Sequence, residues 1–251
     1  MKKYLLLTLA LLTINCKKDQ ATSPKTPLKV STLTFENSNQ TWTEKYTYDE
    51  QEQVSEVAID FNVFTKHKAE YDGDRLLAYN TFQSADTVLV GRDSFIYNMD
   101  NRLEKILKFT TERDGSLRLL WINEFTYDAF GKVRKQIFYL ADRPNEQRTT
   151  SFDWKGNNIS KRTELDGDGK IEHEFFYTYD NKINYLQNLP NYQHDPVNWG
   201  RNNVTKMTYN DYTGLLDLAC GPCEQDYNYN LSGYPTRITY NWGRVLTVQY
   251  E

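Results

Sequence analysis

The 251-residue sequence lacks several features that other classes of protein need. It has no surplus of positive charge, because 30 Lys and Arg stand against 34 Asp and Glu, for a formal net charge of −4. Nucleic-acid binding needs a basic stripe or patch, so we expect no nucleic acid as partner. The Gly-x-Ser-x-Gly, phosphate-loop and dinucleotide-binding patterns are also missing. We therefore expect no cofactor, no catalytic residue and no enzymatic activity.

The chain also lacks helix-forming segments. The nearest amphipathic candidates, residues 185–189 and 214–219, are too short to cover a sheet. Only 7 Pro, 12 Gly and 3 Met occur, against 19 Tyr, 12 Phe and 5 Trp. Aromatic residues and Thr favour the pleated, half-buried surface of a strand. The composition predicts an all-β protein.

The N-terminus has the features of an export signal. A basic start precedes an apolar run from Leu5 to Ile14, which is too short to span a bilayer as a mature helix. The run leads into Cys16 in a pattern that resembles a lipobox, although Asn15 stands where Gly, Ala or Ser is usual. A lipobox cysteine becomes an acylated N-terminus, and several acyl chains give stable anchoring. We expect residues 1–15 to be a lipoprotein signal peptide and Cys16 to carry the anchor.

The segment after Cys16 indicates where the protein is displayed. Residues 16–29 have the composition of a flexible tether. Lys17 and Lys18 begin a charged stretch that resembles the one after the lipidated cysteine of Bacteroidota-type lipoproteins, where it favours surface display. An ordinary polar tether explains the same residues. We expect a protein anchored by lipid in the outer membrane, with the cell surface favoured over the periplasmic face.

A repeat organises residues 30–251, which are enough for a single β-repeat domain with a sizeable core. An aromatic residue, one polar residue, a second aromatic and then Asp or Asn recur, and the second aromatics follow one another at steps of 20 to 30 residues. Two strands and two short turns fill such a step. Alternate aromatics share one face of a strand, and the Asp or Asn begins a turn. The close copies begin at residues 46, 95, 125, 177 and 227, and looser copies lie near 71, 152 and 209.

A long sheet with one aromatic face and no helical layer must hide that face. It can curl on itself or split into two packed sheets. Curling also removes exposed sheet edges. The repeat therefore predicts an antiparallel meander of hairpins that forms a large curled sheet or a barrel in one domain.

These hairpins resemble the YD repeats of the RHS type. The C-terminal part resembles a Bacteroidota lipoprotein family of unknown function that has a porin-like fold. The resemblance covers most of the mature chain and implies a meandering, barrel-like sheet and no known activity. Its motifs are Asn-Asn-Val-Thr at 202–205, Tyr-x-Tyr at 227–229 and Gly-Tyr-Pro-Thr at 233–236, and the repeats are interrupted at 185–203 and 211–224.

Cys220-Gly221-Pro222-Cys223 contains the dipeptide of the thioredoxin redox motif, in which the first cysteine begins a helix. Here the flanks read as β-hairpins, and an exported location favours oxidation. With Cys16 lipidated, these are the only thiols left. We favour a structural disulfide or an inert pair over redox activity or metal binding.

A weak calcium candidate surrounds the Asp-Gly-Asp-Gly sequence at 166–169. Glu164, Asp166, Asp168 and Glu172 space their carboxylates like the first half of a calcium loop, but Phe175 stands where the last ligand should be. A hairpin tip explains the same residues, so we favour a turn. The three histidines lack the spacing that places two rings on one metal, so no metal is expected.

Aromatic side chains are the best candidates for binding, because exposed rings stack on sugars or peptides. Most of the five Trp alternate with strand neighbours and are expected in the core. Trp199 lies in the loop at 194–203. We expect Trp199 to be exposed and to serve as a ligand platform.

Three functional hypotheses remain. The favoured one is a non-enzymatic, lipid-anchored binding or scaffold protein of the cell envelope, with a glycan, a peptide or another envelope protein as partner. The first alternative is a membrane-spanning outer-membrane β-barrel. Residues 241–250 favour it by resembling a barrel-assembly signal, whereas the mean hydropathy of −0.76 and charged outward faces oppose it. The second alternative is a surface glycan-processing enzyme.

Overall fold

The computed structural model describes residues 28–83, 88–187, 189–214 and 222–251. The predicted signal peptide, Cys16, most of the tether and Cys220 lie outside these residues. Within the described part, no helix is long and apolar enough to cross a membrane. The strands are β1 (Val30–Glu36), β2 (Thr41–Tyr48), β3 (Val54–Phe61), β4 (Val63–Asp72), β5 (Arg75–Gln83), β6 (Val88–Tyr97), β7 (Leu103–Thr111), β8 (Leu117–Tyr127), β9 (Val133–Leu140), β10 (Arg143–Lys155), β11 (Asn158–Leu165), β12 (Ile171–Ile183), β13 (Asn202–Asp211), β14 (Cys223–Tyr229), β15 (Pro235–Tyr240) and β16 (Val245–Tyr250).

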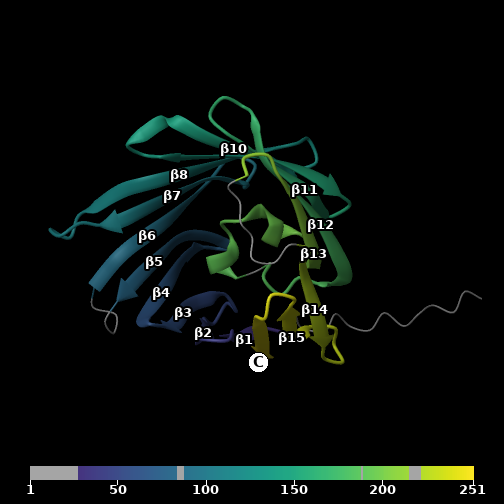
Figure 1. Ribbon diagram of the computed structural model, residues 1–251. Coiled ribbons are helices and arrows are strands. Elements are labelled where there is room, and N and C mark those ends of the chain that lie inside the picture. The colour runs from purple at the N-terminus through teal and green to yellow at the C-terminus, as the bar shows by residue number, and fades with distance from the viewer. Residues whose placement is uncertain (1–27, 84–87, 188, 215–221) are drawn as a thin grey trace, which may run out of the picture.

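The strands described here form one closed antiparallel barrel. Each strand pairs with its neighbours in sequence, and β1 pairs with β16, with Leu33 opposite Val248. Figure 1 shows the purple start and the yellow end of the sheet meeting in this way. The all-β meander is confirmed, and of the two ways to hide its aromatic face the chain takes closure.

The Asp or Asn of the repeat closes a turn at one end of the barrel. In the turn at 128–132, Asp128 Oδ1 accepts the backbone N–H groups of Phe130 and Lys132, both at 2.9 Å. Gly131 has a φ of 80°, a left-handed conformation that glycine adopts without steric cost. The turns at 49–53, 98–102 and 230–234 follow the same pattern. We call this end of the barrel, which also holds Lys29 and Glu251, the repeat-turn end.

The second aromatic of the repeat ties each hairpin to the one before it. Its polar atom donates a hydrogen bond to a backbone carbonyl near the start of a strand of the preceding hairpin. Such a bond satisfies a polar group on a mostly buried ring. Within the described residues, second aromatics make this bond from Tyr48 to Val30, Tyr71 to Val54, Tyr97 to Leu76, Tyr127 to Leu103, Trp154 to Val133 and Tyr179 to Ile159. In the last strands the same bond is made by Tyr227, a first aromatic, to Val204 and by Tyr250, which lies outside the repeat, to Pro235. Together these hydrogen bonds link neighbouring strands around the barrel.

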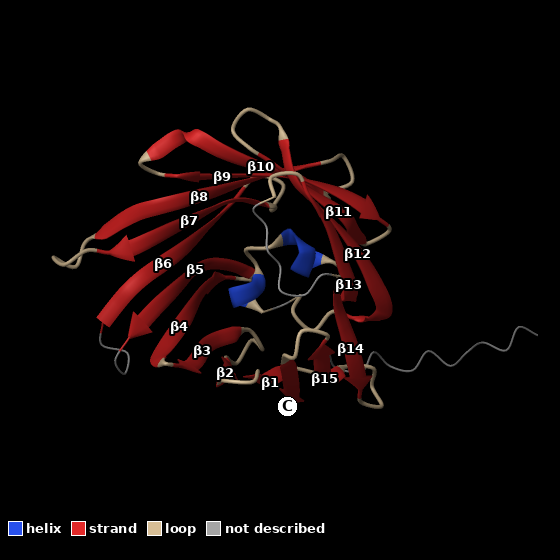
Figure 2. Cartoon of the chain, viewed as in Figure 1, coloured by secondary structure: helices blue, strands red, loops and turns tan. Residues whose placement is uncertain are grey.

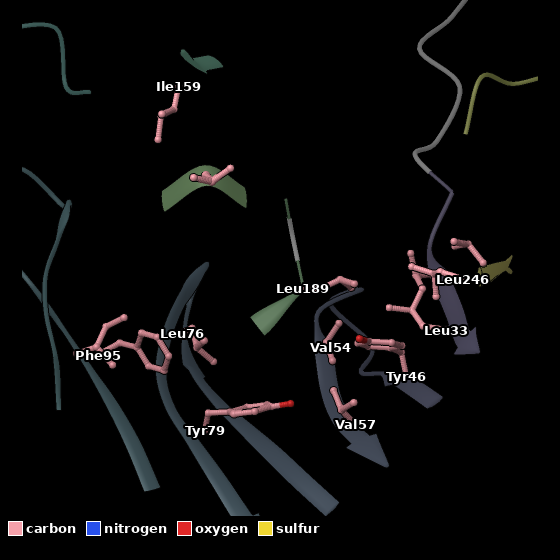
Figure 3. Packing of buried hydrophobic residues seen from close by; sticks show 14 of the residues in the cluster. Leu33, Tyr46, Val54, Val57, Leu76, Tyr79, Phe95, Ile159, Leu189 and Leu246 are labelled. Atoms are coloured by element: carbon pink, nitrogen blue, oxygen red, sulfur yellow. The ribbon is translucent and has the colours of Figure 1, made fainter. Parts of the chain in front are cut away.

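The core lies inside the barrel. Because successive side chains of a strand point to opposite faces, the first aromatic of each repeat faces inward with the second. Tyr46, Phe95, Phe125 and Phe152 are all buried in one cluster of hydrophobic side chains. Figure 3 shows the part of this cluster around Tyr46, where the side chains of several strands point toward the interior.

The outward face carries charge. Lys105 and Glu124 alternate with the buried residues Ile106 and Phe125, so they point outward, and their charged groups lie 2.9 Å apart. Similar cross-strand pairs recur around the barrel. They are Lys66 with Glu56, Arg92 with Glu70, Arg134 with Asp153, Lys161 with Glu174 and Lys206 with Glu224.

The segment between β12 and β13 lies inside the barrel. It contains two short 3-10 helices, η1 (Pro190–Tyr192) and η2 (Pro196–Trp199), which Figure 2 shows within the ring of strands. We call residues 184–187 and 189–201 the luminal segment. Large barrels have a lumen that strand side chains alone do not fill. Here the chain fills part of the lumen with a segment of itself, where the sequence indicated a loop.

Candidate binding cavity

A buried carboxylate holds the middle of the luminal segment. Glu44 of β2 accepts hydrogen bonds from Tyr46 at 2.6 Å, from Asn191 Nδ2 at 2.9 Å and from the Tyr192 hydroxyl at 3.3 Å. Burial raises the pKa of Glu44, and these hydrogen bonds oppose part of that rise by stabilising the charged form. Two of the three donors belong to η1, so Glu44 attaches the luminal segment to the barrel wall.

A second attachment lies on β6, four strands around the barrel from β2. His194 Nε2 lies 3.1 Å from Oδ2 of Asp93 on β6, and the Lys108 ammonium lies 2.8 Å from Asp93 Oδ1. Burial alone would raise the pKa of Asp93, but the His194 hydrogen bond and the Lys108 charge outweigh it and hold that pKa below its ordinary value. Within the described residues, His194 Nδ1 is buried without a hydrogen-bond partner. No nucleophile therefore occupies the position that a Ser-His-Asp triad requires.

A cavity of about 660 Å³ opens at the repeat-turn end, between the barrel wall and the luminal segment. Its barrel wall includes four second aromatics of the repeat. These are Tyr48, Tyr71, Tyr97 and Tyr127, joined by Tyr250. Its inner wall includes Leu189, Gln193 and Trp199, and charged groups at its edge include Lys29, Glu52, Asp74 and Arg102. The volume falls in the range of small-molecule sites.

The hydrogen bonding of the wall determines what it offers to a ligand. Each of these tyrosine hydroxyls donates to a backbone carbonyl, so each ring is held in place. The donor capacity of the hydroxyls is used within the protein, and the rings offer chiefly their apolar surfaces to the cavity. Polar contacts come from the edge, where the Lys29 ammonium lies 3.2 Å from Glu52.

A smaller cavity of about 280 Å³ lies on the other side of the luminal segment, against β11 to β15. Arg162, Tyr177, Asn203 and Met207 line it. Arg162 pairs with Glu164 at 3.1 Å and with Asp195 of the luminal segment at 3.6 Å. These ion pairs make a third attachment of the segment to the barrel.

Trp199 is not exposed as the sequence predicted. Its ring packs inside the barrel, 5.3 Å from the Phe125 ring, and its Nε1 donates to the Gln193 carbonyl at 3.1 Å. The prediction was wrong because the flanking residues have loop composition, while the loop itself turns into the lumen. Trp199 does line the larger cavity, and its role as a ligand platform stays a prediction.

Two other sites were predicted from the sequence, the cysteine pair and the calcium candidates. Cys223 is disulfide-bonded, while Cys220 lies outside the described residues. The calcium candidates do not gather, because Asp166 Oδ1 closes its own turn and Glu164 contacts His173 at 3.2 Å. Among the described residues, no group of three or more His, Cys, Asp or Glu could hold a metal. The remaining calcium candidates, Asp168 and Glu172, therefore belong to no such group.

Sequence reasoning missed the cavity and the residues that hold the luminal segment. Glu44 and Asn191 are 147 positions apart, and Asp93 and His194 are 101 apart, so no local pattern joins them. A signal for the barrel wall did exist. The second aromatic of every repeat was recognised, but not that four of these rings, Tyr48, Tyr71, Tyr97 and Tyr127, would face one cavity.

Comparisons with known proteins show the fold and no more. No protein-family model matches the chain, and no curated protein matches it in sequence. A porin-like protein from Bacteroides uniformis superimposes with a TM-score of 0.55 at 11% identity, over 90% of this chain and 99% of that chain. A porin-like protein from Bacteroides vulgatus gives a TM-score of 0.42 at 10% identity over the same shares. The complex TcdB2-TccC3-Cdc42 gives 0.35 at 11% identity, over 79% of this chain and 12% of that chain. The chain has the fold of a porin-like barrel.

Proposed function

We propose that this protein is a lipid-anchored, non-enzymatic binding protein of the bacterial cell envelope, and that it takes a glycan into the cavity at the repeat-turn end. The observation that carries the proposal is the cavity wall of tyrosine rings, five of whose hydroxyls are bound to backbone carbonyls. Rigid rings with apolar surfaces suit the C–H faces of a sugar at small entropic cost. The polar groups at the cavity edge suit its hydroxyl groups.

Two features oppose a membrane pore. The luminal segment occupies the barrel and is attached through Glu44, Asp93 and Arg162, so the interior is not an open channel. The outward face carries ion pairs such as Lys105 with Glu124, next to strand positions that are fully buried inside. A lipid-facing band requires apolar side chains there, because charge at membrane depth costs several kcal/mol.

The cavity also offers little to a glycan-processing enzyme. Such an enzyme needs two carboxyl groups placed on either side of the scissile bond. Of the carboxylates in the cavity wall, Glu52 is paired with Lys29 and its side chain is 62% exposed to solvent. The general acid of such an enzyme lies in an apolar setting, which the exposed, ion-paired Glu52 does not have. This favours binding over catalysis.

The position of the cavity fits the proposed anchor. Leu28 and Lys29 line the cavity, so the chain enters the barrel beside its mouth. Residues 16–27 span at most roughly 40 Å when extended. A lipid on Cys16 would therefore hold the cavity close to the membrane surface, within reach of glycans carried there.

The test is binding of the purified, lipidated full-length protein to an array of oligosaccharides and polysaccharides. We expect specific binding that Trp199→Ala weakens at least about fivefold, because a lost stacking ring costs about 1 kcal/mol or more. Trp242→Ala is the matched control, since Trp242 lies in the turn between β15 and β16 at the other end of the barrel. Binding that is equal in both variants would place the ligand elsewhere. No binding to any glycan would overturn the proposal in favour of a scaffold for envelope proteins.

A further inference from the structure

Two successive repeats place a cation over an aromatic ring of the next repeat. The position is the fourth residue after the turn-forming Asn98 or Asp128. The Arg102 guanidinium lies 5.7 Å from the centre of the Tyr127 ring, and the Lys132 ammonium lies 5.6 Å from the centre of the Trp154 ring. Cation–π contact stabilises both arrangements. A structural role therefore explains the positive charge of both Arg102 and Lys132. A further role of either residue depends on how their surroundings differ.

The two cations differ in what else surrounds them. Lys132 donates a hydrogen bond to the Gly156 carbonyl and does not line the larger cavity. Arg102 lines that cavity, and within the described residues its guanidinium has neither a hydrogen-bond acceptor nor a carboxylate at ion-pair distance. A guanidinium has five N–H donors in a fixed plane. Arg102 therefore presents unused donors and a full positive charge at the cavity.

Among the residues that the structure describes, the other charges of the cavity wall make no ion pair with Arg102, and the wall carboxylate Asp74 lies beyond ion-pair distance of its guanidinium. Lys29 and Glu52 pair with each other at 3.2 Å, so their charges largely cancel. Gly131 leaves room for the guanidinium, because a Cβ added at this residue would lie only 3.2 Å from Arg102 Nη2. The side chain of Arg102 is therefore held between the Tyr127 ring and a glycine, at the edge of a cavity with aromatic walls.

We propose that Arg102 binds the carboxylate of an acidic sugar, so that the ligand of the cavity is a carboxylate-bearing glycan. This rests on the proposed function, because it names the class of glycan that the same cavity takes. The planar fork of a guanidinium matches the two oxygens of a carboxylate and forms paired, charge-assisted hydrogen bonds. In this arrangement the sugar ring stacks on the tyrosine rings, and Arg102 binds its carboxylate.

The experiment compares acidic oligosaccharides with their own methyl esters, which keep the sugar and remove the charge. The full-length protein is titrated with both forms of each oligosaccharide, as wild type, Arg102→Gln, Arg102→Lys and Lys132→Gln. We expect wild type and Lys132→Gln to bind the acid at least about tenfold more tightly than the ester, because the ester removes the charged acceptor of the guanidinium's hydrogen bonds. Arg102→Gln should lose this preference and bind the ester as wild type does. Arg102→Lys should keep part of the preference, as a charge without the planar fork.

The outcomes separate this inference from the proposed function. Equal binding of acid and ester by wild type, or a preference that Arg102→Gln retains, overturns the role of Arg102 and leaves a neutral glycan in the cavity. No binding of either form overturns the proposed function as well. Thermal unfolding of Arg102→Gln and Lys132→Gln controls for structure: both lose one cation–π contact, and Lys132→Gln also loses its hydrogen bond to the Gly156 carbonyl, so its unfolding temperature should fall at least as far.

Discussion

The hydroxyl of Tyr127 donates a hydrogen bond to the backbone carbonyl of Leu103 at 2.7 Å, and so joins the hairpin that contains β8 to the one before it. The same relationship recurs around the barrel, from Tyr48 onward. It explains why the repeat needs an aromatic residue with a polar atom at its second position. It also places the rings at one end of the barrel, where they form the wall of the cavity.

Removing one of these hydroxyls should weaken the barrel without changing its shape. We expect Tyr127→Phe to lower the free energy of unfolding by about 1 kcal/mol, because the partly buried Leu103 carbonyl loses this donor. Urea-induced unfolding measures this. Tyr234→Phe is the control, since within the described residues the Tyr234 hydroxyl makes no hydrogen bond. Equal effects of the two substitutions would contradict the structural role of the hydroxyl.

The inward face should be sensitive to truncation. Phe152 is 1% exposed and belongs to the core cluster, so Phe152→Ala removes a ring and leaves a void. We expect a loss of about 3–5 kcal/mol in the free energy of unfolding. Phe130, in a turn at the repeat-turn end, is 89% exposed, and Phe130→Ala should change stability by less than about 0.5 kcal/mol. If the two substitutions cost the same, the assignment of faces is wrong.

Stability should fall with acid because of His67. Burial lowers the pKa of His67 from 6.5 to about 4, next to the Tyr79 ring and the Thr81 hydroxyl. Between these values the unfolded chain binds a proton that the folded chain does not, so the contribution to stability is complete above pH 6.5 and is lost toward pH 4. We expect up to about 2 kcal/mol of loss between pH 7 and pH 5. His67→Gln should flatten this part of the pH profile, and an unchanged slope in urea titrations would exclude His67 as its cause.

The luminal segment should loosen when Glu44 is removed. Glu44→Ala leaves Tyr46, Asn191 and Tyr192 without their shared acceptor in a buried place. We expect faster amide hydrogen exchange across the luminal segment and a loss of about 1–3 kcal/mol in stability. Glu36→Ala, at an exposed strand end, is the control and should leave the exchange unchanged. Protection that survives Glu44→Ala would mean that the Asp93 and Arg162 attachments suffice.

The lipid anchor is tested independently of the barrel. Cys16→Ala should abolish labelling by a fatty-acid analogue and release the protein from the membrane fraction, because the acyl chains are its proposed attachment. Cys223→Ala, in the folded domain, should retain both the label and the membrane association. A Cys16→Ala protein that is still labelled with lipid would overturn the lipoprotein assignment.

Much of the architecture could be read from short-range patterns. Aromatic residues at alternate positions predicted strands with one inward face, and Asp128 with Gly131 predicted a turn that the structure contains. These features depend on residues within a few positions of one another, where backbone geometry and side-chain alternation leave few choices. The chain order of the hairpins then followed, because neighbouring strands in a meander pair with each other.

The features that the sequence did not predict depend on contacts between residues far apart in the chain. Local patterns allowed the sheet either to curl or to split, and the pairing of β1 with β16 decided for closure. Loop composition around Trp199 indicated an exposed tip, yet Glu44 and Asp93 draw that segment into the lumen. The sequence by itself determined the strands, the turns and the aromatic inner face, since these follow from local chemistry. Only the tertiary structure decided the closure, the filled lumen and the cavity at Arg102, because each requires side chains far apart in the chain to meet in space.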